Sequence, residues 1–313
     1  MRIRQVMSAA AAAAAVVACA ATAHAEVTRV DIRTRADVLG GRAFGDVGSY
    51  EVLSGTIHFA VDPANAHNTV IVDLDRAPRN AQGRVEFSSD IFVVKPKDPA
   101  RGNGVLFFDV VNRGNKSLLS VFSRGTRATD FRTEAEFGDA SLLRQGYTLV
   151  MVGWQFDIPM GKGQVGFSAP IATANGTPIR GWVRMPFLTD KPAESFQYGG
   201  GYNTATYRPV NVQDRSYRLT VREGTFAPPR LVPRDDWEFA RVDGGRTVPD
   251  PSSVHLKSGF KPGLTYELSY ETENPPVAGL GMAAMRDAAS AFKYGGSPVA
   301  TGKLAYMYEI GRA

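Results

Sequence analysis

The sequence predicts an α/β fold built on a mixed, mostly parallel β-sheet. Two nearly continuous apolar runs, Val105–Val111 and Tyr147–Val152, have the character of central strands that are covered on both faces. A helical pattern over Val277–Phe292 is followed by a glycine-containing loop and a third apolar run, Leu304–Ile310. Helices that alternate with buried strands are typical of α/β domains.

The N-terminal part predicts an antiparallel edge of this sheet. Glu26–Val38 alternates weakly and predicts a first strand, whereas Tyr50–Val61 alternates clearly until it ends at Asp62-Pro63. Val85–Val94 predicts a further strand. We expect these last two strands to pair antiparallel at the edge of the sheet.

Residues 105–155 predict a strand–helix–strand unit. Asp139–Gln145 begins with acidic and hydroxyl residues, contains two leucines and is followed by Gly146, which predicts a short helix. This helix lies between the first two apolar runs. We therefore expect two parallel strands joined by a right-handed crossover.

The second half of the chain changes character and then returns to the helix–strand pattern. Over residues 156–264, glycine and proline are frequent and short alternating runs recur, which predicts a β-rich insertion or lid. Asn274-Pro275-Pro276 then favours a helix start, and the small residues that follow predict close packing on the sheet. The expected organisation is residues 1–25 as a signal peptide, 26–155 as the N-terminal part of the core, 156–264 as the insertion, and 265–313 as a core helix and strand.

The first residues predict export. A basic start is followed by an Ala/Val run over Ala9–Ala18, and Ala23-His24-Ala25 fits an A-x-A cleavage site. The run is shorter than the roughly 20 residues that a membrane span requires. We therefore expect a periplasmic or secreted protein with no membrane span. Val16–Cys19 also loosely resembles a lipoprotein cleavage box, so a lipid anchor at Cys19 is the alternative.

Composition limits the partners. Removal of residues 1–25 takes away Arg2 and Arg4 and no acid, so the net charge falls from +5 by 2 to +3. A charge this small, with no basic stripe, argues against a nucleic-acid partner. Because Cys19 is the one cysteine and lies in the predicted signal, the mature chain has no disulfide and no thiolate to bind a metal.

Three glycine-containing motifs lack the context that their chemistry requires. Gly161–Gly166 fits G-x-G-x-x-G, but Ala169-Pro170 follows it where a helix would have to start. Gly295–Lys303 has the wrong spacing for a phosphate loop, and Gly166–Pro170 begins like a serine elbow without the second glycine. We therefore expect no cofactor.

The titratable residues suggest neither a catalytic dyad nor a metal site. None of His58, His67 and His255 is placed to form a Ser–His pair, and metal spacing such as H-E-x-x-H is absent. We interpret the carboxylate pairs Asp73/Asp75 and Asp235/Asp236 as solvated turn residues.

Asn112-Arg113-Gly114-Asn115 is the strongest candidate site. It directly follows the apolar run Val105–Val111, and open α/β sheets bind their ligands at the carboxyl ends of such strands. A glycine there lets backbone amides face an oxyanion, and one such donor stabilises a transition state by about 3 kcal/mol. The alternative is a tight polar loop that caps a helix.

Several segments resemble one known family. These segments are Gly40–Gly45, Tyr50–Glu51, Gly55–Pro63, Ala77–Asn80, Asp98–Gly104, Val111–Lys116 and Leu143–Tyr147. The family is that of the bacterial secreted alpha/beta hydrolase domain proteins, a divergent branch of the α/β-hydrolases, and the resemblance covers essentially the whole mature chain. It implies an α/β-hydrolase-like sheet and a small-molecule, ester-like substrate.

The resemblance also implies which functional residues this chain lacks. In the family, the strand that Leu304–Ile310 resembles leads into G-x-S-Q-[ST]-G-R, whose serine is taken as the nucleophile, with an acid and a histidine further on. Here the sequence reads Gly311-Arg312-Ala313, so these three residues have no counterpart, and only Asn112–Asn115 corresponds to a family site, the oxyanion loop. We therefore expect the N-terminal portion of an exported, esterase-type hydrolase that is inactive alone. The alternative is a non-catalytic, secreted, β-rich binding module.

Overall fold

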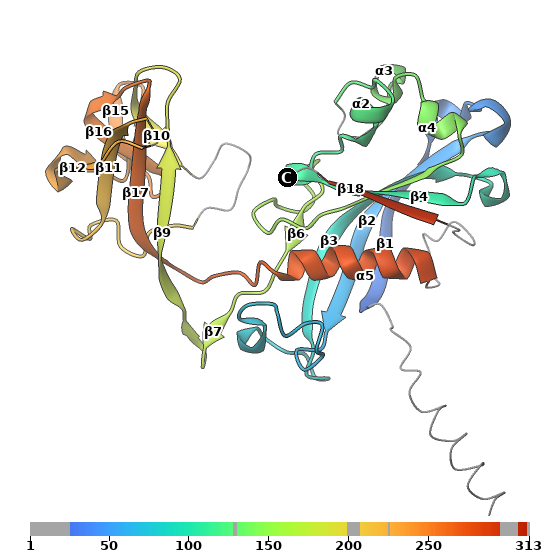
Figure 1. The fold of residues 1–313 in the computed structure, drawn as a ribbon, viewed down its shortest axis with the longest axis horizontal. Coiled ribbons are helices and arrows are strands. Elements are labelled where there is room, and N and C mark those ends of the chain that lie inside the picture. The colour runs from blue at the N-terminus through green and yellow to red at the C-terminus, as the bar shows by residue number, and fades with distance from the viewer. Residues whose placement is uncertain (1–25, 128–129, 199–206, 225, 295–305, 312–313) are drawn as a thin grey trace, which may run out of the picture.

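The protein folds into two units, a large one built on a mixed sheet and a small one built of antiparallel strands (Figure 1). A computed structural model describes residues 26–127, 130–198, 207–224, 226–294 and 306–311, the last range by its backbone alone. The predicted signal peptide, the alternative lipid anchor at Cys19 and the Gly295–Lys303 loop lie outside the described residues.

The sheet of the large unit has the strand order β1-β2-β3-β5-β4-β18. Its strands are β1 (Val27–Asp37), β2 (Tyr50–Val61), β3 (Val85–Pro96), β4 (Val105–Val110), β5 (Thr148–Val152) and β18 (Tyr306–Gly311), and the short β6 (Phe167–Ser168) also pairs with β3. Each of the six main strands was predicted by its alternation or by its apolar run. These strand predictions are confirmed.

The pairing changes direction across this sheet. The pairs β1–β2, β2–β3 and β3–β5 are antiparallel, whereas β5–β4 and β4–β18 are parallel. The predicted antiparallel edge and the predicted parallel pair of residues 105–155 are therefore confirmed. The connection between β4 and β5 carries three short helices, α2 (Leu118–Phe122), α3 (Glu134–Phe137) and α4 (Ser141–Arg144).

The small unit spans residues 180–273. Its sheets have the orders β12-β11-β17-β9 and β10-β16-β13, with a separate hairpin β14-β15. The strands are β9 (Arg180–Phe187), β10 (Ala193–Gln197), β11 (Arg218–Glu223), β12 (Arg230–Val232), β13 (Trp237–Glu238), β14 (Ala240–Asp243), β15 (Arg246–Pro249), β16 (Ser253–Phe260) and β17 (Leu264–Glu273). They enclose a separate core that is rich in aromatic side chains, among them Tyr217, Trp237 and Tyr270.

The predicted fold class is wrong. We expected an α/β-hydrolase-like, mostly parallel sheet, but three of the five pairings along the main sheet and every pairing in the smaller sheets are antiparallel. The physical reason lies in the connections. A parallel pair needs a crossover of a dozen or more residues, usually helical. Among the described residues, α-helix occurs only within 118–144 and 280–294, so the connections β1–β2 and β2–β3 contain no α-helix that could form a crossover.

Two adjacent segments connect the units. Residues 169–179 lead into the small unit and include the hairpin β7 (Thr173–Ala174) and β8 (Thr177–Pro178). Residues 274–279 lead back. The two segments pair through a bridge between Ile171 and Pro276 and through three backbone hydrogen bonds of 3.0, 2.9 and 3.1 Å. We call this paired connection the neck.

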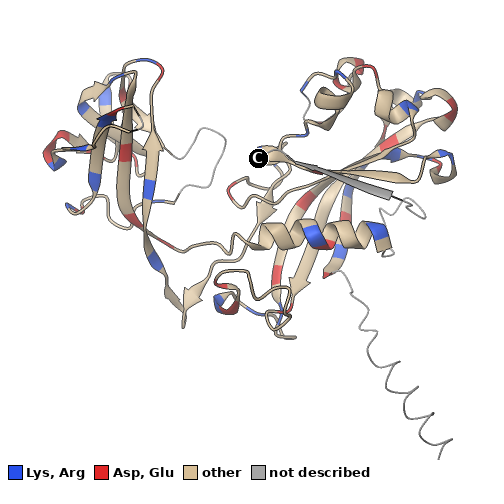
Figure 2. Ribbon diagram, viewed as in Figure 1, with Lys and Arg blue, Asp and Glu red and all other residues tan. Residues whose placement is uncertain are grey.

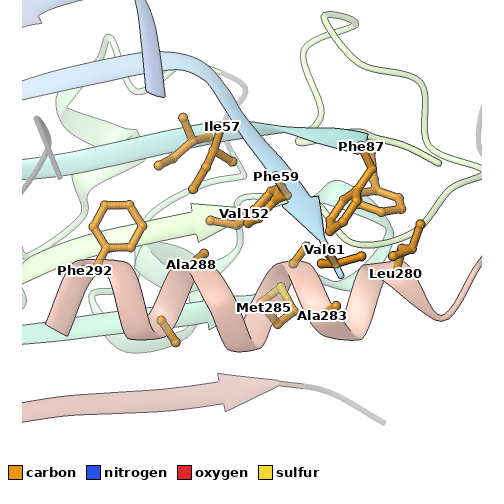
Figure 3. Close-up of a cluster of buried hydrophobic side chains, with 14 of the residues drawn as sticks. Ile57, Phe59, Val61, Phe87, Val152, Leu280, Ala283, Met285, Ala288 and Phe292 are labelled. Atoms are coloured by element: carbon orange, nitrogen blue, oxygen red, sulfur yellow. The ribbon is translucent and has the colours of Figure 1, made fainter. Parts of the chain in front are cut away.

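Helix α5 (Leu280–Tyr294) covers one face of the large sheet (Figure 3). Figure 3 shows that one side of the helix faces the apolar side chains of the sheet. All of these side chains belong to one buried cluster. The helix contributes Leu280, Ala283, Met285, Ala288 and Phe292, and the sheet contributes Ile57, Phe59, Val61, Phe87 and Val152. The predicted packing of small residues against the sheet is confirmed. The approach is closest at Gly281, where an added Cβ would lie 1.9 Å from the carbonyl oxygen of Trp154.

The close approach at Gly281 reverses the usual effect of glycine in a helix. Glycine to alanine normally stabilises a helix by about 1 kcal/mol. We expect Gly281→Ala instead to destabilise the protein by about 1–3 kcal/mol, because the new methyl group meets backbone that cannot move aside. Urea unfolding measures the change. Met282→Ala, at the neighbouring exposed position, is the control and should shift the free energy by about 0.5 kcal/mol or less.

Candidate functional site

Three parallel strands end at the same edge of the main sheet. The register places Gly311 of β18 beside Val110 of β4, and Val110 beside Val152 of β5. The segments that follow β4 and β5 therefore leave the sheet side by side. The carboxyl ends of parallel strands are the usual location of ligand sites, and the predicted loop 112–115 lies here.

The loop after β4 has a strained, glycine-dependent backbone. Asn112–Gly114 forms one 3₁₀ turn, in which Arg113 and Gly114 both have left-handed conformations with φ of 54° and 67°. Glycine adopts this conformation freely, whereas arginine does so at a cost. A Cβ at Gly114 would lie 2.8 Å from the carbonyl oxygen of Val165, so the position also lacks room for a side chain.

The segment after β5 holds this loop in place. The backbone N–H of Arg113 donates to Oε1 of Gln155 at 2.6 Å, and Nε2 of Gln164 donates to the carbonyl oxygen of Arg113 at 2.7 Å. The N–H of Val165 donates to the carbonyl oxygen of Gly114 at 2.9 Å. Both sides of the turn are therefore hydrogen-bonded before any ligand arrives, as a preorganised site requires.

Among the side chains of the loop, that of Arg113 is mostly buried and forms an ion pair, whereas the two asparagine amides are exposed. Nη1 of Arg113 lies 2.7 Å from Oδ2 of Asp157, and both side chains are mostly buried. Asn112 and Asn115 are exposed, and Nδ2 of Asn115 donates to the carbonyl oxygen of Asn112. Because Gln155 already accepts the Arg113 N–H, an oxyanion at this edge would have to bind the exposed amides or another N–H of the loop.

The histidines lie away from this edge. In the part of the chain that the structure describes, no histidine ring hydrogen-bonds to a serine or threonine hydroxyl. Nε2 of His58 lies 3.1 Å from Asp31 in the β1–β2 pair. Nδ1 of His255 lies 3.5 Å from Glu238 in the small unit, and His67 hydrogen-bonds through its backbone, whose N–H donates to Asn65 and whose carbonyl oxygen accepts from Arg286.

The two carboxylate pairs lie in turns outside the segments that follow β4 and β5. Asp73 pairs with Arg76 at 3.5 Å, and Asp235 pairs with Arg215 at 2.8 Å. Their neighbours at positions 75 and 236 are exposed. Neither pair is arranged for acid–base chemistry on a shared substrate.

Sequence reasoning missed the residues that support the loop. Gln155 and Asp157 come soon after the strand predicted over Tyr147–Val152. The argument that ligand sites lie at the carboxyl ends of strands therefore applied to them as well as to Asn112–Asn115. Gly161–Gly166 was considered only as a nucleotide motif. In the structure, Gln164 and Val165 of this segment contact the loop, and the close backbone approach between the two occurs at Gly114.

No protein-family model, curated protein or solved structure matches this chain. Among the residues that the structure describes, no group of three or more His, Cys, Asp or Glu side chains is arranged to hold a metal ion. None of the described helices has the length and apolar character needed to cross a membrane. Basic and acidic residues are interspersed over both units (Figure 2). Function therefore has to be argued from the site.

We expect Gly114→Ala to destabilise the protein more than Gly176→Ala does. Both glycines have positive φ, 67° and 81°, so both substitutions carry backbone strain of about 1 kcal/mol. Only at Gly114 does the added methyl group also meet backbone, and this adds about 1–3 kcal/mol. Urea unfolding of the two variants compares them directly. Equal losses would show that the loop is not held against Val165.

Proposed function

We propose that this protein is part of an exported ester hydrolase that acts by serine acyl transfer, with the loop 112–115 beside the reacting carbonyl group. The register that sets Gly311 beside Val110 carries the proposal. A nucleophile delivered from the end of β18 would reach the edge at which this loop lies. The resemblance of residues 40–147 to secreted hydrolases supports the same reaction, and the N-terminal pattern supports export.

The proposed role of the loop is electrostatic. When a serine hydroxyl attacks an ester carbonyl, negative charge develops on the carbonyl oxygen. Donors that are already held in place stabilise this charge without reorganising at the moment of reaction. The bonds from Gln155, Gln164 and Val165 provide such rigidity. In the residues that the structure describes, we assign no nucleophile, acid or histidine.

A second candidate is a non-catalytic binding module. Residues 180–273 bury an aromatic core of their own but leave Trp182 56% exposed and Leu231 65% exposed. Trp182 and Leu231 lie on the two outer strands of one sheet, β9 and β12, and each offers an exposed apolar contact for a partner or a ligand. On this proposal the small unit would bind its target and no turnover would follow.

Turnover separates the two proposals. The polypeptide expressed with whatever its gene encodes after residue 313 should hydrolyse p-nitrophenyl acetate and form a covalent serine adduct with a fluorophosphonate probe. Residues 1–313 alone should do neither, because no Ser–His pair is present in the described residues. Mass spectrometry of the labelled peptide identifies the serine. Absence of labelling in the gene product favours the binding module. Turnover by residues 1–313 would contradict the proposal, because it would require a nucleophile within these residues.

In the active polypeptide, Gln155→Ala should lower kcat by up to about 10²-fold and leave KM little changed. The reason is that loss of the 2.6 Å hydrogen bond frees the Arg113 backbone and misplaces the donors, which act in the transition state. Gln82→Ala, at an exposed turn, is the matched control and should leave both constants unchanged. An unchanged kcat in Gln155→Ala would remove the loop from the mechanism.

A further inference from the structure

A cavity of about 630 Å³ lies beside the candidate site, on the antiparallel side of the sheet. Strands β1, β2 and β3 form one wall, and the segments 130–132 and 161–165 form the other. Lys116, which directly follows the loop 112–115, lines it as well. The volume falls within the range of small-molecule sites, roughly 300–1,000 Å³.

The three carboxylates that line this cavity each have a cation of their own. Asp90 pairs with Arg33 at 2.8 Å, Asp130 pairs with Arg132 at 3.2 Å, and Asp37 pairs with Lys97 at 2.8 Å. Within these pairs the charges cancel. Arg33 and Arg132 line the cavity themselves, whereas Lys97 pairs with Asp37 from outside it. Once these three cations are matched with their carboxylates, the ammonium group of Lys116 is the remaining charge.

Lys116 is a buried cation without a carboxylate in contact. The residue is 7% exposed, its Nζ donates to the carbonyl oxygen of Gly163 at 2.5 Å, and the same atom lies 4.8 Å from the ring centre of Phe92. No carboxylate among the described residues lies within ion-pair distance of it. Burial lowers the pKa of Lys116, and the more distant Asp130 and Asp90 oppose this shift. A buried ammonium group is costly until an anion accompanies it.

We propose that this cavity binds a small organic monocarboxylate, whose carboxylate group pairs with Lys116 and whose apolar body packs against the adjacent rings of Phe92 and Phe131. One negative charge balances the one uncompensated cation, so a doubly charged phosphate would exceed the charge available. Both rings line the cavity, together with Val52 and Val165, and they give the ligand an apolar surface. The proposal is independent of ester hydrolysis, because a non-catalytic protein with this cavity would bind the same ligand.

The first test uses the unmodified protein and two probes of nearly equal shape. Isothermal titration calorimetry compares 4-phenylbutyrate with its neutral analogue 4-phenylbutanamide. We expect the carboxylate to bind more tightly by about tenfold or more, the effect of one charge-assisted hydrogen bond. Equal affinities, or no binding of either probe, would overturn the proposal.

The second test assigns the preference to one residue. In Lys116→Met the carboxylate should lose its advantage, whereas the affinity for the amide should stay unchanged, which also shows that the variant is folded. Lys95→Met is the matched control. Lys95 is a buried lysine that pairs with Glu51 at 3.1 Å outside the cavity, and Arg35 remains as a partner for Glu51. If Lys116→Met keeps the preference for the carboxylate, the assignment is wrong.

A third variant keeps the test decisive if Lys116→Met does not fold. Ser54 lies on the β2 wall of the cavity, and Ser54→Leu fills part of the space while leaving the ammonium group intact. We expect it to weaken the carboxylate and the amide together, by about tenfold. Unchanged binding of both probes to Ser54→Leu would place their site elsewhere on the molecule and would contradict the proposal.

Discussion

The arrangement of the large unit depends on the buried carboxylate of Asp90. Its Oδ1 accepts a hydrogen bond from Arg33 of β1 at 2.8 Å, and its Oδ2 accepts the backbone N–H groups of Gly161 at 2.8 Å and Gly166 at 3.1 Å. A buried carboxylate is stable only when such bonds are made. One side chain in β3 therefore holds the segment 161–166 against the sheet and also contacts β1, which pairs with β2 along its length.

The hydrogen bonds of Asp90 bear on both functional proposals. The segment that Asp90 anchors supplies Gln164 and Val165 to the candidate loop, and its Gly163 accepts the ammonium hydrogen bond of Lys116. The oxyanion loop and the cavity thus share one structural support, although they use different atoms of it. A ligand in the cavity would contact the same backbone that positions the loop, which makes communication between the two sites physically direct.

The sequence identified strands more reliably than it identified the sheet. Alternation in Tyr50–Val61 and continuous apolar character in Val105–Val111 are local features, and they located the two strands correctly. They did not predict the burial, because β2 is buried on both faces and half of the residues of β4 are only partly buried. Strand direction depends on connections, and the parallel pairs around β4 were wrongly extended to the whole sheet. The charge arrangement of the cavity was beyond sequence reasoning, because Arg33, Asp90 and Asp130 are distant in the chain and meet only through tertiary structure. The loop at Asn112–Asn115 was located correctly at a strand end, but its supports were not recognised.

The neck has a consequence for how the small unit could be gained or lost. Its two segments enter and leave the large unit as hydrogen-bonded neighbours at Ile171 and Pro276, so the roughly one hundred residues between them begin and end at almost the same point. The entropy of closing a loop grows only slowly with its length. Excision of the whole small unit, or its exchange for an unrelated domain, would therefore change the free energy of unfolding of the large unit only slightly. The small unit is in this sense a replaceable module, free to diversify while the sheet stays the same.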